Sequence, residues 1–149
     1  MNNTNNSLGR WISLLYRFGK IYIGRKLEPQ CIRNSQYIFL NALYKQDGIN
    51  QDEISEYLKI DKGTTAKAIK QLEKDGYVIR QEDTKDKRKK KVFLTEKAQK
   101  VKPAIRSALV SWNDGLWKGF TAEERVYTLK MIERIANNAI LLIDRDNNI

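Results

Sequence analysis

Apolar side chains recur at helical spacing along most of the chain. From about Leu8 to Leu27 they follow the i, i+3, i+4 pattern, and further isoleucines make the apolar stripe wider than one packing face needs. Pro29 then ends this helix, because proline lacks the N–H that a helix interior requires. A shorter helix is predicted over residues 35–46. Residues 1–7 are polar apart from Met1 and predict a disordered tail.

The next segment has the pattern of a helix-turn-helix. A capping box formed by Asn50 and Glu53 predicts the start of a helix that runs to Leu58. Almost at once, residues 61–76 predict a second helix, with Asp61 as its N-cap and a glycine as its left-handed stop. A short helix, a tight turn and an amphipathic basic helix are typical of a helix-turn-helix.

The helix over residues 61–76 has two unlike faces. One face is suited to packing and carries Thr65, Ala66, Ile69 and Leu72. The other offers cations, hydroxyls and an amide, and carries Gly63, Thr64, Lys67, Lys70, Gln71 and Lys74. Such groups reach phosphates and base edges. Ordinary surface helices have a similar composition, so the flanking segments decide between the two interpretations.

After Gly76 the period changes from helical to alternating. The stretches YVIRQ and VFLT predict two paired strands, and the segment between them is too charged to pack. Six basic residues and one acid, Asp86, lie between Lys85 and Lys91. Alone, this tip fits a solvated loop or a nuclear-localisation-like run. Directly after a basic helix, it indicates the wing of a winged helix that binds nucleic acid.

Two further helices complete the chain. The first is predicted from Glu96 to Leu116, with a kink or a loosened turn at Pro103. A capping box at Thr121 opens the last helix, which runs to about Ile143 and has a wide apolar stripe. The predicted fold is mainly α with a small β-hairpin wing. Residues 35–95 form the winged helix, and residues 8–34 and 96–149 form helices that make an obligate homodimer.

Composition narrows the function classes. The 149 residues carry a net charge of +10, which favours a polyanionic partner. Histidine is absent and Cys31 is the single cysteine, so imidazole metal sites, His-dependent triads and intrachain disulfides are excluded. No apolar run approaches the roughly 20 residues of a membrane span. We expect a cytoplasmic protein that is not an enzyme and has no cofactor.

The most specific motif lies in the predicted wing. Asp86-Lys87-Arg88 is followed six residues later by Leu94-Thr95, and the segments SQYIFLNAL and INQDEISEYLKIDKGTTAKAIKQLEKDGYVIR precede it. On these stretches, residues 32–98 resemble the multiple-antibiotic-resistance regulator (MarR) family of bacterial transcription factors. Gly63 and Ala66 depart from the hydroxyl residues that many members carry, and Ala98 replaces a usual glycine. The departures at Gly63 and Ala66 affect the base-contact pattern rather than the fold.

The resemblance implies a dimeric repressor that binds a pseudo-palindromic DNA duplex and is released by a small-molecule effector. The recognition-helix residues expected at the DNA are Lys62, Gly63, Thr64, Lys67, Lys70 and Gln71. The wing residues are Asp86, Lys87, Arg88, Lys89 and Lys90. Arg88 is expected in the minor groove, with Asp86 holding it in a bidentate pair. Further phosphate contacts are expected from Gln51, Arg33 and Gln36.

Other interpretations stay open from the sequence. A winged helix can also bind RNA, single strands or a protein partner, although the basic face and the wing tip lack the aromatic side chains on which single-stranded bases stack. Trp11, Trp112 and Trp117 fit core or dimer-interface positions, and alternatively the wall of a pocket for an aromatic effector. Cys31 lies outside the position at which oxidant-sensing family members place their cysteine, which predicts an inert thiol.

Overall fold

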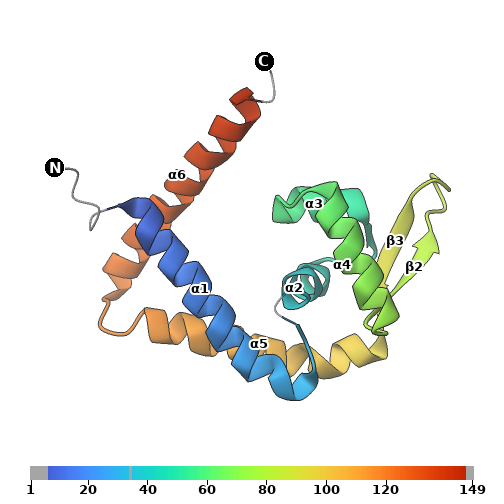
Figure 1. Cartoon of the computed structure of the whole chain (residues 1–149), viewed down its shortest axis with the longest axis horizontal. Helices are drawn as coiled ribbons and strands as arrows, with labels where there is room; N and C mark the ends of the chain where they lie inside the picture. The colour runs from blue at the N-terminus through green and yellow to red at the C-terminus, as the bar shows by residue number, and fades with distance from the viewer. Residues whose placement is uncertain (1–6, 34, 147–149) are drawn as a thin grey trace. The chain divides into compact units, whose positions relative to one another are not determined.

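The computed structural model describes residues 7–33 and 35–146 (Figure 1). The chain divides into two compact units, one up to Trp112 and one from Asn113 onward. The predicted tail over residues 1–7 lies outside the described residues, except for Ser7 at the N-cap position of the first helix. The fold is mainly helical with one small antiparallel sheet, which confirms the predicted class. In the part described, no helix combines the length and apolarity needed to cross a membrane.

The elements follow the predicted order. They are α1 (Leu8–Leu27), the 3-10 turn η2 (Glu28–Gln30), α2 (Tyr37–Lys45), β1 (Ile49–Asn50), α3 (Gln51–Leu58), α4 (Lys62–Lys74), β2 (Val78–Glu82), β3 (Lys90–Leu94), α5 (Glu96–Leu116) and α6 (Ala122–Asp146). The second helix is shorter than predicted, since Gln36 occupies its N-cap position. The last helix runs three residues past the predicted end. Helix α5 continues through Pro103, so the proline does not end it.

The sheet contains one strand more than the predicted hairpin. Its order is β1-β3-β2, all antiparallel, with Val78 opposite Leu94 in the hairpin and Ile49 opposite Val92 in the added strand. Gly48 makes this addition feasible. Its φ is +75°, and a Cβ atom there would lie 2.7 Å from the ring of Phe93. Only glycine therefore lets the chain turn into β1 so close to β3.

One hydrophobic core holds the first unit together. Fully buried side chains come from α1, α2, α3, α4, the sheet and α5, and include Leu27, Leu40, Leu43, Ile54, Ile69, Leu72, Val92 and Ile105. Trp112 packs against this core, and its ring centroid lies 5.5 Å from that of Tyr22. The backbone of Gly19 approaches the same indole, because a Cβ atom there would lie 3.3 Å from it. The core thus fixes α3, α4 and the wing relative to α1 and α2.

The second unit comprises the end of α5 and the whole of α6. The predicted capping box is confirmed, since Thr121 N–H donates to Glu124 Oε2 at 2.8 Å and Glu124 N–H donates to Thr121 Oγ1 at 3.2 Å. Trp117 stacks edge-on against Phe120. None of the described α6 side chains is buried, and several large apolar ones are more than half exposed, among them Val126, Leu129, Ile132 and Ile143.

Candidate nucleic-acid interface

Helix α4 presents one polar face to solvent. Thr65, Ile69 and Leu72 are fully buried, as predicted for its packing face. The opposite face is exposed and carries Lys62, Gly63, Thr64, Lys67, Lys70 and Lys74. The helix therefore offers four lysines and a hydroxyl along one side.

Both ends of α4 are fixed by residues beside them. Thr64 N–H donates to Asp61 Oδ1 at 2.8 Å, which confirms the predicted N-cap. Hydrogen bonds from the Thr64 side chain and backbone hold the pKa of Asp61 below its ordinary value. At the other end Gly76 has a φ of +79°, which confirms the predicted stop. The position of the exposed face is thus set by capping as well as by packing.

The first turn of α3 lies next to the first turn of α4. The predicted capping box is present, with Glu53 N–H donating to Asn50 Oδ1 at 3.0 Å and Asn50 N–H to Glu53 Oε2 at 2.7 Å. Gln51 follows the cap and is half-buried. The Nζ atom of Lys62 lies 3.4 Å from Asp52 Oδ1, and both side chains are exposed. Such a pair contributes little to stability, so Lys62 can exchange its partner for a phosphate.

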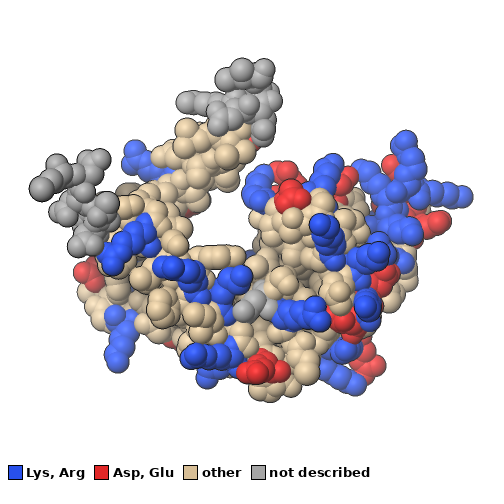
Figure 2. Space-filling view, in the orientation of Figure 1, with Lys and Arg blue, Asp and Glu red and all other residues tan. Residues whose placement is uncertain are grey.

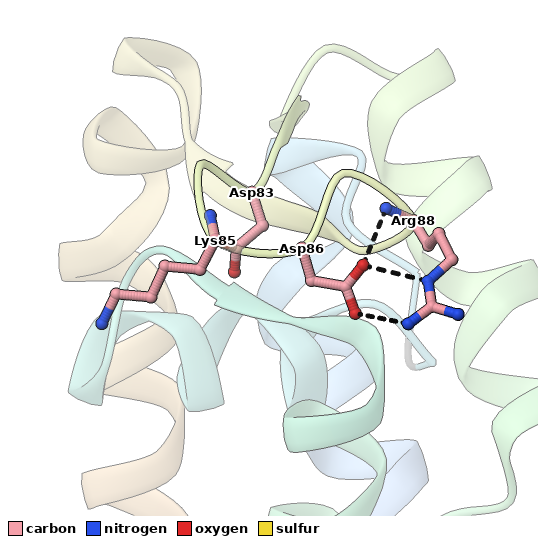
Figure 3. A network of polar contacts seen from close by, with 4 residues as sticks. All are labelled: Asp83, Lys85, Asp86 and Arg88. Carbon is pink, nitrogen blue, oxygen red and sulfur yellow. Dashed lines mark hydrogen bonds and ion pairs between the residues drawn. The ribbon is translucent and has the colours of Figure 1, made fainter.

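The wing tip holds Arg88 against Asp86 (Figure 3). Arg88 Nε donates to Asp86 Oδ1 at 3.2 Å, Nη2 donates to Oδ2 at 3.5 Å, and the Arg88 backbone N–H donates to Oδ1 at 3.1 Å. The predicted pair is confirmed. The two side chains meet within a turn, which Lys89 N–H closes by donating to the Asp86 carbonyl. The bonds from Arg88 lower the pKa of Asp86.

A second aspartate shapes the other side of the tip. Lys85 N–H donates to Asp83 Oδ1 at 2.8 Å, and Asp83 N–H donates to the Lys89 carbonyl at 2.9 Å. The bond from Lys85 lowers the pKa of Asp83. In Figure 3 the side chain of Lys85 extends away from Arg88. Two side-chain-capped turns therefore give the tip a defined shape, although its basic side chains are exposed.

A polar hollow of about 290 Å³ lies between the start of α3 and the wing. It is lined by Asn50, Gln51, Asp52, Arg80, Arg88, Lys89 and Lys90. The fold thus brings the predicted Gln51 together with three of the predicted wing residues. Figure 2 shows Lys and Arg side chains gathered at the wing end of the winged helix, with Asp and Glu between them. The lining carries four cations and one carboxylate, but Arg80 and Arg88 are each paired with a carboxylate outside the lining, Glu73 and Asp86. An anion in this hollow would therefore meet mainly Lys89 and Lys90.

Arg80 was absent from the residues predicted for the site. Its Nε and Nη2 atoms donate to Glu73 Oε2 at 3.0 and 2.5 Å, which links β2 to α4. Arg80 lowers the pKa of Glu73, and the carboxylate in turn raises the pKa of the guanidinium. The strand pattern YVIRQ offered a signal, because residue 80 falls on the same face as the inward Val78 and lies half-buried.

Three residues predicted to contact DNA lie in surroundings other than those expected. Gln36 is 2% exposed, with its Oε1 accepting from Arg33 N–H and its Nε2 donating to Asp75, so its side chain is held inside the protein, out of reach of a phosphate. Arg33 is exposed, and it lines a hollow with Cys31 and residues of α1 rather than the hollow at the wing. Gln71 is half-buried and donates to Asp75 Oδ1 at 2.9 Å.

An apolar cavity of about 340 Å³ lies between α1, α2 and the start of α4. Its lining includes Leu15, Tyr16, Lys20, Tyr37, Thr64 and Trp112. Burial, and to a smaller extent the neighbouring Tyr16, raises the pKa of Tyr37. Trp112 therefore both packs on the core and walls a cavity, the two positions considered for it. Thr64 belongs to this wall and to the polar face of α4.

The remaining candidate chemistry is sparse. Cys31 is exposed and unpaired with another cysteine, and it adopts a left-handed conformation with a φ of 57°. Over residues 7–33 and 35–146, no group of three or more acidic or cysteine side chains could hold a metal ion.

Comparisons with known proteins agree with this architecture. Residues 32–90 match the family described as the MarR family. The uncharacterized HTH-type transcriptional regulator YybA of Bacillus subtilis (strain 168) is 35% identical over 77% of this chain and 74% of its own length. A MarR transcriptional regulator from Methanosarcina mazei Go1 is 44% identical, with a TM-score of 0.80 over 91% of this chain and 90% of that one.

A further solved structure contains nucleic acid. It is a MarR family transcriptional regulator from Listeria monocytogenes complexed with a 26mer DNA. It is 28% identical to this chain, covers 89% of both chains and has a TM-score of 0.84. The chain therefore belongs to the MarR family, whose members are DNA-binding transcriptional regulators and not enzymes.

Proposed function

We propose that this regulator binds a pseudo-palindromic DNA duplex as a homodimer, with α4 in the major groove and the wing in the minor groove. The observation that carries this proposal is the exposed basic face of α4 beside a wing tip that holds Arg88 by its pair with Asp86. A helix-turn-helix inserts its second helix with the N-terminal turns deepest. The DNA complex of the Listeria relative supports the same partner.

Separate roles follow for the exposed residues. Thr64, Lys67 and Lys70 reach base edges, while Lys62 and Gln51 bind phosphates at the starts of α4 and α3. Gly63 adds no side chain and leaves room for the DNA. Arg88 enters the minor groove, where narrow A·T-rich stretches attract guanidinium groups. The wing lysines that add sequence-independent attraction are Lys87, Lys89 and Lys90.

We assign the dimer to the helices outside residues 35–95. Helix α1 exposes large apolar side chains, among them Leu8, Trp11, Ile12, Leu15 and Phe18. Helix α6, considered on its own, exposes Val126, Leu129, Ile132 and Ile143. Large apolar side chains exposed at helical spacing along a helix are unfavourable in water and are typical of subunit interfaces. A two-fold dimer would set its two α4 helices about one DNA turn apart, roughly 34–36 Å.

The cavity between α1, α2 and α4 supports regulation by a small aromatic molecule. Its walls are mainly apolar and aromatic, with a few polar groups, which is the usual make-up of a ligand site. The polar groups come from Lys20, Tyr16, Tyr37, Ser35 and Thr64. Because Thr64 lines this cavity, an occupant would contact the helix that reads the DNA. We infer a repressor that the effector releases, acting in the cytoplasm with the DNA it regulates.

The test is binding of the purified protein to duplexes selected from a random pool. We expect a palindromic site bound at least 1,000-fold more tightly than scrambled duplexes, and a dimer by sedimentation at micromolar concentration. Preference for single strands or RNA of the same sequence would favour the alternative winged-helix functions instead. A folded monomer that binds DNA with full specificity would contradict the dimer. Repeating the assay with aromatic compounds tests release.

A further inference from the structure

Asp75, just after α4, joins three elements through its carboxylate and carbonyl. Its Oδ2 accepts from Gln36 Nε2 at 2.6 Å, and its Oδ1 accepts from Gln71 Nε2 at 2.9 Å. Its carbonyl oxygen accepts from Lys97 Nζ at 2.6 Å. The carboxylate is thus held between a residue at the start of α2 and a residue on α4, while α5 holds the backbone.

These bonds fix the orientation of each amide. The Arg33 backbone N–H can only donate, so the group of Gln36 that faces it at 3.0 Å must be Oε1. Gln36 therefore turns its Nε2 toward Asp75. An ionised carboxylate can only accept, so Gln71 must also turn its Nε2 toward Asp75. The direction of both amides follows from groups whose hydrogen-bonding character is unambiguous.

The oxygen of the Gln71 amide remains free to accept a hydrogen bond from outside the protein. Within the described residues no protein group donates a hydrogen bond to Gln71 Oε1, and this oxygen is not buried. Gln71 lies on the same side of α4 as Lys67 and Lys70. Its carbonyl oxygen is therefore the group that Gln71 offers beyond the protein.

We propose that Asp75 is a positioning residue that makes Gln71 present a hydrogen-bond acceptor to the major groove. This inference rests on the proposed function, since it requires α4 to lie at base edges. In the major groove the amino groups of adenine and cytosine are the donors, whereas guanine and thymine present acceptors at the equivalent position. Asp75 would thus favour adenine or cytosine at one symmetric pair of operator positions without touching the DNA.

The variant Asp75→Asn tests the orientation. Gln36 still needs an acceptor, so the oxygen of the introduced side-chain amide faces Gln36 and its NH₂ group faces Gln71. Gln71 then turns its Oε1 inward and its NH₂ outward. We expect the preference at that position to move from adenine or cytosine toward guanine or thymine, with the ratio of dissociation constants changing by about 5-fold or more. A general loss of stability would weaken all duplexes alike and leave this ratio unchanged.

Two further variants complete the design. Gln71→Ala should remove the preference, and adding Asp75→Asn to it should change nothing more at that position. Asp114→Asn removes the same charge from an exposed site on α5 and should leave the ratio as in the wild type. The inference is overturned if Asp75→Asn keeps the wild-type base preference, or if Gln71→Ala keeps it. It is also overturned if Asp75→Asn changes the preference by the same factor when Gln71 has been replaced by alanine. Failure of the wild type to bind any duplex specifically would instead reject the proposed function.

A measurement on the wild type covers the case in which Asp75→Asn does not fold. The side-chain amide signals of Gln71, assigned by their loss in Gln71→Ala, should show that the hydrogen donated to Asp75 is protected from solvent exchange. Signals that exchange as fast as those of an exposed glutamine would overturn the inference.

Discussion

Arg80 of β2 binds Glu73 of α4 through two nitrogens on one carboxylate oxygen, at 3.0 and 2.5 Å. This pair joins the base of the wing to the helix beside it, seven residues away along the chain and across a turn. Its side chains are 28% and 36% exposed, so solvent screens the interaction only in part. We therefore expect the pair to add a modest stabilisation and to help hold the wing at its place beside α4.

Breaking this pair should loosen the wing. For Glu73→Gln we expect the free energy of unfolding to fall by no more than about 1 kcal/mol, and the preference for A·T-rich flanks to weaken several-fold because Arg88 is held less firmly. Binding to flank variants and urea unfolding measure the two effects. Glu56→Gln, which breaks the exposed pair with Lys59, is the matched control and should alter neither. An unchanged flank preference in Glu73→Gln would contradict this role.

The same pair predicts a dependence on pH. Arg80 lowers the pKa of Glu73 in the folded protein below its ordinary value of 4.5. The folded state therefore favours the ionised carboxylate, and its contribution is complete above pH 4.5 and lost as the pH falls through the lower folded pKa. When the pH is lowered into the acid range, the free energy of unfolding should therefore fall less in Glu73→Gln than in the wild type.

Local signals explain what could be predicted from the sequence. Asp61 and Gly76 bracket α4, and Asn50 with Glu53 opens α3, because each cap acts on a turn next to it in the chain. The Asp86–Arg88 pair was predicted from the two-residue spacing on a hairpin, and it is present, although a turn rather than a strand brings the two side chains together. Helical and alternating periods located the remaining elements, since they report burial of one face.

Contacts between distant residues explain what could not be predicted. Gln36 and Asp75 are 39 residues apart, so no local pattern pairs them. Gln36 shares a helix face with the inward Leu40 and Leu43, so its spacing placed it on the packing face of α2. This spacing was a signal against a phosphate contact, and the prediction did not use it. Strand β1 was missed as part of the sheet because its two residues gain their partner only when Gly48 turns the chain toward Phe93.

Lys59 closes α3 in a conformation that glycine adopts more easily. Its φ is 53°, where a Cβ atom crowds the backbone at a cost of roughly 1–2 kcal/mol. We expect Lys59→Gly to raise the free energy of unfolding by about 0.5–1 kcal/mol, since the greater freedom of glycine in the unfolded chain offsets part of the gain. Lys59→Ala removes the same ion pair but keeps the Cβ atom, and thermal unfolding should show no gain for it. If Lys59→Gly and Lys59→Ala were equally stable, the backbone at residue 59 would not be strained by a Cβ atom.

Tyr44 links α2 to α5 through its hydroxyl. It donates to the Ala98 carbonyl at 2.5 Å, and burial, with a smaller contribution from Tyr77, raises the pKa of Tyr44 to about 12. The folded state favours the neutral phenol, so this contribution to stability is complete below pH 10 and lost as the pH rises toward 12. Tyr44→Phe should cost about 1 kcal/mol at neutral pH and reduce the alkaline loss. Tyr127→Phe, at an exposed site on α6, is the control.

The last prediction distinguishes residues that recognise the base sequence from residues that bind the phosphate backbone. Lys67 lies in the first turns of α4, where base edges are within reach, whereas Lys89 and Lys90 lie at the exposed tip beside the polar hollow. Loss of a base contact costs about 1–3 kcal/mol and relaxes the preference at one symmetric pair of positions. Loss of a phosphate contact weakens all duplexes alike and reduces the salt slope by about 1 per contact. We therefore expect Lys67→Ala to change which sequences bind.

The double variant Lys89→Ala with Lys90→Ala should instead reduce affinity and its salt dependence for every duplex. Arg88→Ala should fall between the two, because it loses the preference for A·T-rich flanks that α4 does not touch and also removes one charge from the hollow. The measurement is binding of each variant to one palindrome and to scrambled duplexes at three or more salt concentrations. If the lysine double variant lost sequence preference while Lys67→Ala kept it, the wing rather than α4 would read the operator, and the proposed division between them would be wrong.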